Sequence, residues 1–193
     1  MVKALVIVAH PDDETIWMGG KILREKDWGW VVLSLCRKDD PDRAPKFFRV
    51  MEKLNARGFM SDLEDDQPEQ PLEDIDEVVR RIEPVVDDKK FDVVYTHAPN
   101  GEYGHNRHKE TNRAVHLMID DGLLECNELF EFDYVRRENP FRTEPNPKAN
   151  IKFTLTPQEF EKKRYLINEV YGFRKDSFEY ISCHGIEPFR KVK

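Results

Sequence analysis

The sequence predicts a single α/β domain over residues 1–193, with a Rossmann-like, mostly parallel sheet and helices on both of its faces. Three compact runs rich in Val and Leu have the composition of buried strands, and they occupy residues 2–9, 29–35 and 91–97. Helix-like sequence long enough for a crossover separates each run from the next, which is the pattern of a parallel sheet. A chain of 193 residues is long enough for one sizeable core and short for two.

The first crossover helix is predicted to begin near Asp13 or Glu14. Its apolar side chains at helical spacing, which should face the core, are Ile16, Ile22 and Leu23. The adjacent residues Gly19 and Gly20 are unfavourable inside a helix. The pair therefore indicates a close approach between this helix and a strand.

Further helices are predicted by the apolar periodicity of residues 47–59, 75–86 and 107–122. The last of these is expected to stop at Gly122. The acidic stretch of residues 61–77 is interpreted as a solvated loop that runs into a helix start, because runs of charge are usually solvated.

In the C-terminal third of the chain the apolar period loosens, and strands are predicted over residues 129–138 and 150–156. Residues 139–150, which contain several Pro and Asn, would connect these two strands. A last helix is predicted over residues 157–173. It opens with a proline, and the preceding Thr156 is a suitable N-cap.

Composition and charge exclude several classes of protein. The formal net charge is -7 and the sequence pI is near 5.5, with no basic stripe interleaved with aromatic residues, so nucleic acid is not an expected partner. No apolar run is long enough to span a membrane, and the N-terminus does not have the pattern of a signal peptide. Cys36, Cys126 and Cys183 form no CxxC pair and fit buried thiols in a reducing compartment, so we expect a cytoplasmic protein.

The first predicted strand breaks off into His10, Pro11, Asp12 and Asp13. Ionisable groups placed directly after a buried strand are costly to desolvate unless something at that spot compensates for the cost. In an open parallel sheet, the carboxyl end of a strand borders the crevice where ligands bind. Taken alone, this stretch also fits a loop whose aspartates cap the next helix.

A second strand end repeats the arrangement. After the predicted strand at residues 91–97, a short turn-rich loop delivers Tyr103, His105 and His108 just as a helix begins. Two strand ends therefore each offer imidazole, and one of them adds carboxylates. An imidazole, a carboxylate and a second imidazole form the ligand set of a catalytic zinc that keeps a coordination position for water.

Spacing divides the roles within this set. Asp12 and Asp13 are neighbours, so their side chains leave the backbone in different directions and are not expected both to ligate one small ion. One can bind the metal while the other takes a proton from the attacking water, as metal-assisted hydrolysis requires. His105 and His108 are three residues apart and would share a face of the first helical turn, one reaching the metal and the other the reacting group.

Two motifs carry a resemblance to a known family. The stretch AHPDDE at residues 9–14, together with PNGEYGHNRH at 99–108, resembles the zinc-dependent N-acetylglucosaminyl deacetylases of the PIG-L or LmbE-like family. The glycine pair at 19 and 20 is similar to the family's first helix, and GIEPF at 185–189 is similar to its C-terminal ending. Members deacetylate GlcNAc-phosphatidylinositol, the mycothiol and bacillithiol precursors, and chitobiose.

The resemblance implies a role for each motif residue. His10, Asp13 and His108 match the zinc ligands of the family, and Asp12 matches its general base. His105 matches the histidine that polarises the substrate carbonyl and stabilises the oxyanion, and that serves as proton donor to the leaving amine. The choice of Asp13 over Asp12 as ligand comes from the resemblance alone.

Tyr103 falls where several members place a mobile tyrosine beside that oxyanion. The implied reaction is hydrolysis of the N-acetyl group of an N-acetylglucosamine-containing small molecule or conjugate, with one Zn²⁺ per chain, although Fe²⁺ fits the same donor set. A His-x-Ser-Gln pattern that the family often has near the end of its last helix is replaced here by EVYGFRKDSF. Substrate contacts from that region are therefore not implied.

Other candidate residues have weaker support. Arg43 and Arg49 follow the second strand, where family members use an arginine to hold substrate, but solvated surface positions are the simpler interpretation. His97 ends the third strand, where lining a pocket and a hydrogen-bonded packing role are equally compatible with the sequence. His116 and His184 are interpreted as structural.

Two other classes of function compete with a deacetylase. A Mg²⁺-dependent phosphohydrolase could place paired aspartates after a first strand, but it would prefer oxygen ligands to imidazoles. A non-catalytic nucleotide-binding domain would need a GxGxxG loop where this chain has acidic residues. A related amidase acting on a non-sugar N-acyl substrate, and a homo-oligomeric state, are both compatible with the sequence.

Overall fold

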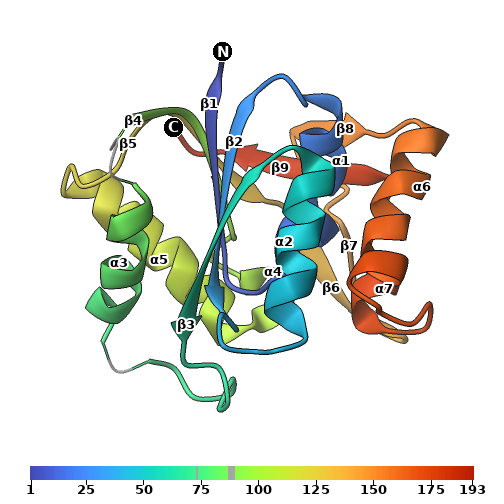
Figure 1. Ribbon diagram of the computed structural model, residues 1–193, viewed down its shortest axis with the longest axis horizontal. Helices are drawn as coiled ribbons and strands as arrows, with labels where there is room; N and C mark the ends of the chain where they lie inside the picture. Colours follow the sequence, from blue (N-terminus) through green and yellow to red (C-terminus); the bar gives the residue numbers. More distant parts are fainter. Residues whose placement is uncertain (73, 87–89) are drawn as a thin grey trace.

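A sheet of seven strands forms the centre of the part of the chain that the computed structural model describes, which is residues 1–72, 74–86 and 90–193 (Figure 1). The strands, in chain order, are β1 (Lys3–Val8), β2 (Gly29–Cys36), β3 (Arg57–Leu63), β4 (Lys90–Thr96), β5 (Glu125–Phe132), β8 (Ile151–Thr154) and β9 (Ile186–Lys191). Their order across the sheet is β3-β2-β1-β4-β5-β9-β8. The first five in this order pair in parallel, and β9 runs antiparallel to both β5 and β8. The predicted α/β class is therefore confirmed.

Strand β1 lies between β2 and β4, and its side chains enter two different cores. Val6 packs in the core on one face of the sheet, whereas Leu5 and Ile7 pack in the core on the other. All three side chains are fully buried. A strand covered on both faces has a continuous apolar sequence, which is why β1, β2 and β4 could be recognised without the structure.

Helices cover both faces of the sheet (Figure 1). They are α1 (Asp13–Arg24), α2 (Arg43–Leu54), α3 (Asp76–Ile82), α4 (Gly101–Gly104), α5 (Asn106–Asp120), α6 (Pro157–Tyr165) and α7 (Phe178–Ile181). Ile16 of α1 and Phe47 of α2 share one apolar core. Val79 of α3 and Val115 of α5 share the other. The predicted stop at Gly122 is confirmed, because α5 ends just before this residue and Gly122 has a φ of 70°.

The first crossover helix, α1, begins at Asp13 as predicted. The three apolar side chains expected to face the core are buried or packed against it, and they are Ile16, Ile22 and Leu23. A side-chain carbon at Gly20 would overlap the side chain of Leu155, just past β8. The Gly20 amide donates to Oε1 of Glu187 on β9 at 2.7 Å, so the predicted close approach of α1 to the sheet exists.

Helix α2 ends earlier than predicted, and a strand follows it. The helix stops at Leu54 because Asn55 adopts the left-handed conformation, with a φ of 54°. Residues 57–63 then form β3, of which only one residue is buried. Gly58 lets this edge strand pass close to α2, since a Cβ there would lie 2.6 Å from the Met51 side chain. An edge strand so weakly buried lacks the apolar alternation that sequence patterns detect.

The segment predicted as one strand over residues 129–138 forms two. β5 ends at Phe132, Asp133 interrupts the pairing, and β6 (Tyr134–Glu138) leaves the main sheet. β6 forms an antiparallel hairpin with β7 (Phe141–Pro145), which lies inside the predicted connector. The connector prediction was therefore wrong, because a strand of five residues that ends at Pro145 lies between its other Pro and Asn residues.

The last predicted helix is correct at its start and wrong at its end. Thr156 forms a capping box with Glu159, as its place before a proline suggested. The α-helix α6 stops at Tyr165, and a π-helix, η2 (Leu166–Val170), continues the chain. Strand β9 was not predicted, because it contains a proline and mixes charged with apolar residues. A short 3-10 helix, η1 (Glu83–Val85), similarly extends α3.

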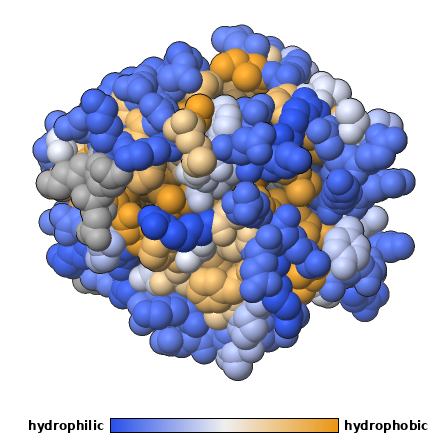
Figure 2. Space-filling model, turned by 45° about the horizontal axis from the view of Figure 1, so that its top comes forward, coloured by the Kyte–Doolittle hydropathy of each residue, from blue (hydrophilic) through white to orange (hydrophobic). Residues whose placement is uncertain are grey.

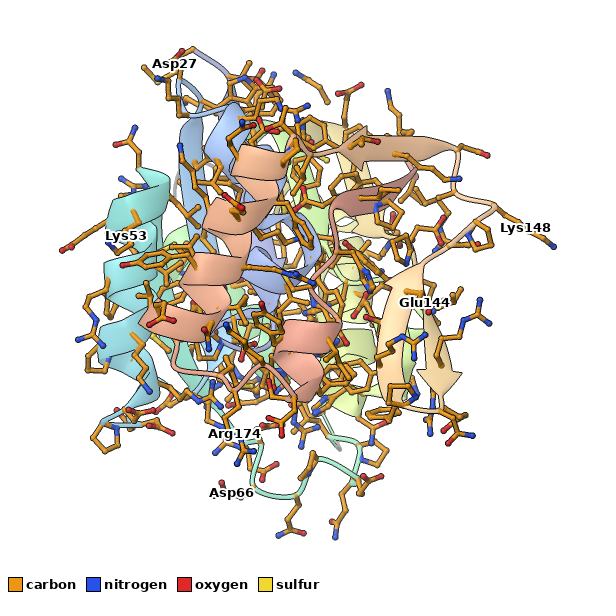
Figure 3. All side chains as sticks on the ribbon, turned by 90° about the vertical axis from the view of Figure 1, so that its right-hand side faces the viewer. Asp27, Lys53, Asp66, Glu144, Lys148 and Arg174 are labelled. Carbon is orange, nitrogen blue, oxygen red and sulfur yellow. The ribbon has the colours of Figure 1, made fainter. Side chains whose placement is uncertain are left out.

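The surface is strongly charged, in agreement with the composition. Figure 2 brings the top of the Figure 1 view forward and shows hydrophilic side chains over most of that face, with hydrophobic ones gathered toward its middle. Figure 3 shows Asp27, in the turn before β2, at the opposite end of the molecule from Asp66 and Arg174. Among the described helices none is long and apolar enough to cross a membrane. The three cysteines are free and buried, as expected.

Candidate metal centre and pocket

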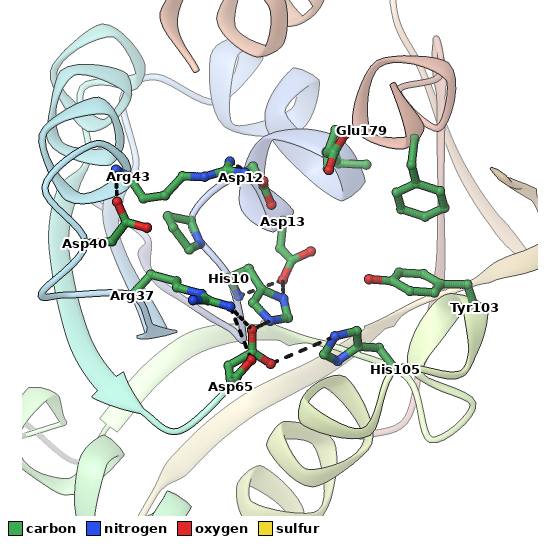
Figure 4. Close-up of a pocket in the computed structure, with 13 residues that line it drawn as sticks. His10, Asp12, Asp13, Arg37, Asp40, Arg43, Asp65, Tyr103, His105 and Glu179 are labelled. Atoms are coloured by element: carbon green, nitrogen blue, oxygen red, sulfur yellow. Dashed lines mark hydrogen bonds and ion pairs between the residues drawn. The ribbon is translucent and has the colours of Figure 1, made fainter. Parts of the chain in front are cut away.

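Four polar segments meet at the carboxyl edge of the parallel strands (Figure 4). They follow β1, β2, β3 and β4, and together with α7 they enclose a pocket of about 380 Å³. The residues that line this pocket are His10, Pro11, Asp12, Asp13, Ile16, Arg37, Asp40, Arg43, Asp65, Tyr103, His105, Phe178 and Glu179. Five of the six site residues predicted from the sequence line it, and His108 is buried next to His10.

Three potential ligand atoms form a nearly equilateral triangle at the pocket. Nδ1 of His10 lies 3.2 Å from Nε2 of His108 and 3.3 Å from Oδ2 of Asp13. Nε2 of His108 lies 3.4 Å from the same oxygen. Ligand atoms about 2.0–2.1 Å from a tetrahedral zinc ion are separated from one another by roughly 3.3–3.4 Å. The donor set therefore fits one zinc ion and leaves one tetrahedral position for another ligand.

Two buried carboxylates orient the histidines of this triangle. Nε2 of His10 lies 3.1 Å from Oδ2 of Asp65, and Nδ1 of His108 lies 2.6 Å from Oε2 of Glu102. Each carboxylate accepts the proton on the outer ring nitrogen and so leaves the inner nitrogen free to bind a metal. Such carboxylate-histidine pairs are the usual support of a zinc site.

His97 is excluded from the ligand set by its own hydrogen bonds. Its Nε2 accepts from the backbone N–H of Ala9 at 3.0 Å, and its Nδ1 lies 2.7 Å from Oε2 of Glu102. The ring stacks on that of His108 with centroids 3.8 Å apart. Both ring nitrogens are thus engaged, so His97 is a buried packing residue that helps to hold Glu102 and His108.

Asp13 is held as a carboxylate. Its Oδ1 accepts from the indole N–H of Trp17 at 2.9 Å, and its Oδ2 accepts from the backbone N–H of His10 at 2.8 Å. Burial favours the neutral form, but the imidazoles of His108 and His97 outweigh it and hold the pKa of Asp13 well below its usual range. Burial likewise disfavours charge on His10, yet Asp13 and Asp65 raise the pKa of His10 to about 10. The carboxylates of Asp13 and Asp65 therefore favour a positive charge at the His10 side of the triangle.

Asp12 lies in different surroundings. Burial, followed by the charge of Asp13, raises the pKa of Asp12 well above its usual range. Its Oδ2 pairs with Nη1 of Arg43 at 3.2 Å. Of the two adjacent carboxylates, Asp13 is thus fixed as an anion, and Asp12 is able to carry a proton.

The backbone of Asp12 adopts a conformation that non-glycine residues rarely use, with a φ of 139°. The buried Glu14 supports it, because its Oε2 accepts from the Asp12 N–H at 3.1 Å and its Oε1 accepts from the hydroxyl of Tyr171 at 2.8 Å. Strained backbone of this kind persists where the surrounding structure holds it and is concentrated at functional sites.

His105 caps the N-terminus of α5. Its Nδ1 accepts from the backbone N–H of Arg107 at 3.2 Å, so the neutral ring carries its proton on Nε2. That nitrogen lies 4.0 Å from Oδ1 of Asp65. Burial, together with the neighbouring His108 and His10, lowers the pKa of His105 to about 3. His105 therefore presents a neutral N–H donor to the pocket.

Tyr103 directs its hydroxyl into the pocket (Figure 4). Its ring packs edge-on against His108 and against Phe178 of α7, with centroids 5.2 Å and 4.6 Å apart. Burial and the nearby carboxylates of Asp13 and Asp12 raise the pKa of Tyr103, so the hydroxyl keeps its proton and can donate a hydrogen bond.

Sequence reasoning missed four residues that lie beside the candidate metal centre. Asp65 lies in the acidic stretch that was interpreted as solvated, yet it is 8% exposed because Arg37 and His10 both bind it. Glu102 lies within the second motif but was given no role. Arg43, interpreted as a solvated residue, instead pairs with the pocket carboxylate Asp12. Glu179 of α7 was not considered, because no local pattern links that helix to the strand ends.

The remaining weak candidates lie outside the site. Arg49 is exposed, as expected. Nε2 of His184 donates to the carbonyl oxygen of Thr143 at 2.6 Å, and His116 pairs with Glu131 at 2.8 Å. Neither of these two histidines lines the pocket, in agreement with the structural role predicted for them.

Solved structures with the same fold include enzymes of two kinds. The hydratase of 4-carboxy-2-hydroxymuconate, GalB, from Pseudomonas putida KT2440 superposes with a TM-score of 0.72 at 16% identity, covering 100% of this chain and 97% of GalB. The N,N'-diacetylchitobiose deacetylase of Pyrococcus horikoshii superposes with a TM-score of 0.69 at 18% identity, covering 98% of this chain and 83% of the deacetylase. The zinc-inhibited form of teicoplanin deacetylase Orf2 superposes with a TM-score of 0.62 at 13% identity, covering 88% of this chain and 83% of Orf2.

Sequence similarity is more specific than the shared fold. The uncharacterized protein L374 of Acanthamoeba polyphaga mimivirus is 24% identical over 126 residues, which cover 58% of this chain and 56% of that protein. This chain therefore matches little more than half the length of that relative. Residues 5–119, more than half of the chain and including both motifs of the metal centre, match the family described as PIG-L, GlcNAc-PI de-N-acetylase. This chain belongs to the PIG-L family.

Proposed function

We propose that the protein is a metal-dependent hydrolase that removes the acetyl group from an N-acetylglucosamine unit of a small molecule or conjugate. The observation that carries this proposal is the triangle of His10 Nδ1, Asp13 Oδ2 and His108 Nε2, which has the spacing of ligands around one zinc ion. Membership of a de-N-acetylase family supports the reaction, and two solved structures of the same fold are deacetylases. A bound Zn²⁺ or Fe²⁺ would supply Lewis acidity for the acyl oxygen and would lower the pKa of water.

Asp12 is proposed as the general base. Arg43 occupies its Oδ2, so Oδ1 remains to take a proton from the attacking water. Burial and the charge of Asp13 raise the pKa of Asp12, so it holds that proton more firmly than an ordinary aspartate does. Asp12 can then return the proton to the amine nitrogen as the C–N bond breaks, and acetate and a free amine result.

His105 and Tyr103 are proposed to stabilise the oxyanion of the tetrahedral intermediate. Each offers one hydrogen-bond donor to the pocket, the Nε2–H of a neutral imidazole and a phenolic O–H. Donors fixed in place before the reaction lower its barrier because they do not reorganise as charge develops. A neutral His105 would become an imidazolate if it gave up its proton, so we assign protonation of the amine to Asp12 instead.

Hydration of a carbon-carbon double bond is the second candidate, because GalB is a hydratase with the same fold. A metal centre with an adjacent base could activate water for either reaction. The substrate named for GalB is a carboxylated acid, whereas carboxylates outnumber guanidinium groups in the pocket of this chain. Charge therefore favours a neutral acetamide. A Mg²⁺-dependent phosphohydrolase is less well supported, because two imidazoles suit zinc better than magnesium.

Acetate release tests the proposal. Zinc-loaded protein should release acetate from N-acetylglucosamine or N,N'-diacetylchitobiose, and a non-sugar acetamide such as N-acetylputrescine separates a sugar deacetylase from a related amidase. Asp12→Asn should keep its metal and lose roughly two to four powers of ten in kcat, the usual contribution of a positioned base. Hydration of 4-carboxy-2-hydroxymuconate without acetate release from any acetamide would refute the deacetylase.

A further inference from the structure

The pocket beside the metal centre carries more negative than positive charge. Five carboxylates and two guanidinium groups line it, and they belong to Asp12, Asp13, Asp40, Asp65, Glu179, Arg37 and Arg43. With all five carboxylates ionised and the imidazoles neutral, a divalent ion held by the ligand triangle would still leave one negative charge in excess. The net field therefore opposes the entry of an anion.

Both arginines are already engaged with carboxylates of this chain. Nη2 of Arg37 pairs with Oδ2 of Asp65 at 2.9 Å. Nη1 of Arg43 pairs with Asp12 at 3.2 Å, and its guanidinium lies over the ring of Phe173, 4.3 Å from the centroid. The charge of each guanidinium is therefore already paired with a carboxylate of this chain.

Four of the five carboxylates are engaged as well. Asp12 and Asp65 pair with the arginines, Asp13 belongs to the ligand triangle, and Oδ1 of Asp40 accepts from two backbone N–H groups at 2.9 Å. Glu179 is the exception, because no group among the described residues donates to it or pairs with it. Its carboxylate lies on the pocket side of α7 (Figure 4). It is free to accept a hydrogen bond from a ligand.

Short-range contacts of its neighbours hold the helix that carries Glu179. Oγ of Ser177 accepts from the N–H of Tyr180 and caps α7. The ring of the adjacent Phe178 packs against Tyr103, with centroids 4.6 Å apart, and stacks on Phe141 of the hairpin at 5.1 Å. The α7 backbone next to Glu179 is thus held by the same aromatic cluster as the proposed oxyanion donor Tyr103.

We propose that Glu179 is a specificity-determining residue that selects neutral or cationic acetamides against anionic ones. It would accept a hydrogen bond from a hydroxyl or ammonium group of the substrate, beyond the acetamide. This inference rests on the proposed deacetylation. A phosphate or carboxylate on the same part of the substrate would face Glu179 and Asp12 with no unpaired cation among the described pocket residues. Like charges placed together in this way give selectivity by repulsion.

Matched sugars and matched variants test the proposal. N-acetylglucosamine and N-acetylglucosamine 6-phosphate differ by one anionic group, and their binding to metal-free protein by calorimetry avoids direct ligation of zinc by phosphate. The wild-type protein should prefer the neutral sugar by about tenfold or more. Glu179→Gln should reduce this ratio several-fold, and Glu179→Lys should reverse it. The control is Asp176→Asn, an exposed residue of the preceding turn that pairs with Arg174 at 2.8 Å, and its ratio should equal that of the wild type.

A second measurement compares kcat/KM for acetate release from the same two sugars, N-acetylglucosamine and its 6-phosphate, by zinc-loaded wild-type and variant proteins. Equal or tighter binding of the 6-phosphate by wild-type protein, or an unchanged ratio in Glu179→Gln, would overturn the role of Glu179. Release of acetate together with such a result would leave the deacetylase intact. Conversely, no acetate from either sugar, with the predicted binding ratios, would refute the deacetylase and retain Glu179 as the selecting residue.

Discussion

His105 illustrates how a single backbone hydrogen bond limits the chemistry of a side chain. The N–H of Arg107 occupies Nδ1, so protonation of the ring would break the cap of α5. Burial and two neighbouring imidazoles lower the pKa of His105 to about 3, so the ring is neutral near neutral pH. A metal ion nearby would favour the neutral form further. The ring can therefore donate a hydrogen bond, but it is a poor proton reservoir.

Replacement of His105 tests this limit. His105→Gln should lower kcat and kcat/KM together by roughly two to three powers of ten, because one donor to the oxyanion is lost and ground-state binding is not. Metal content should not change. Since His105 does not titrate between pH 5 and 9, the pH profile of kcat/KM should keep both limbs, at lower amplitude. Loss of the alkaline limb in this variant would instead identify His105 as the acid that protonates the amine.

Site residues that directly follow a recognisable buried strand could be predicted from the sequence. Site residues that reach the pocket only through the pairing of distant segments could not. His10, Asp12 and Asp13 follow a strand so apolar that their position at a ligand-binding edge could be inferred directly. Asp65 lies 55 residues further along, in a stretch whose charges are mostly solvated, and only the pairing of β3 with β2 carries it to His10. No local pattern contains that pairing.

The same distinction applies to the elements. β1, β2 and β4 are buried on both faces and were recognised as apolar runs. β3, β7 and β9 are partly exposed or contain proline, so their sequences resemble loops. Burial on both faces leaves a sequence signature, whereas pairing at an edge depends on backbone hydrogen bonds that any residue can supply.

The contact between α1 and α6 gives a prediction for pH-dependent stability. Glu159 of α6 forms a two-pronged ion pair with Arg24 of α1, which holds the pKa of Glu159 down at about 2. Because the folded pKa lies below the ordinary value, the pair stabilises the fold above about pH 4.5 and this contribution is lost as the pH falls toward 2. Glu159→Gln keeps an acceptor for the capping box and should lower the free energy of unfolding at pH 7 by about 1 kcal/mol, since both side chains are partly solvated.

Urea unfolding of both proteins across pH 2 to 7 measures this effect. The difference between Glu159→Gln and wild type should shrink to near zero at pH 2, and 1 M salt should reduce it at pH 7. Glu161→Gln on the same helix is the matched control, because Glu161 is exposed and makes no ion pair in the described structure. A constant difference at every pH would mean that the glutamine disturbs the cap rather than the ion pair.

At the scale of the whole molecule, the ligand triangle joins segments that are far apart in the sequence. His10 and Asp13 follow the central strand β1, whereas His108 lies on α5, 98 residues after His10. In the unfolded chain these atoms would seldom meet, so a metal ion should bind the folded state far more tightly than the unfolded state. Metal binding should therefore stabilise the entire fold and not only the pocket.

Thermal unfolding with and without zinc measures this linkage. At about 100 times the dissociation constant, zinc should add about 2.7 kcal/mol, which raises the Tm of a chain of this length by roughly 5–10 °C, and a chelator should reverse the rise. Asp13→Ala removes one corner of the triangle and should abolish most of the rise. Asp66→Ala, an exposed carboxylate of the acidic loop, should retain it. If both variants kept the full increase in Tm, zinc would bind outside the triangle, because a site built on Asp13 Oδ2 loses charge and geometry together when that oxygen is removed.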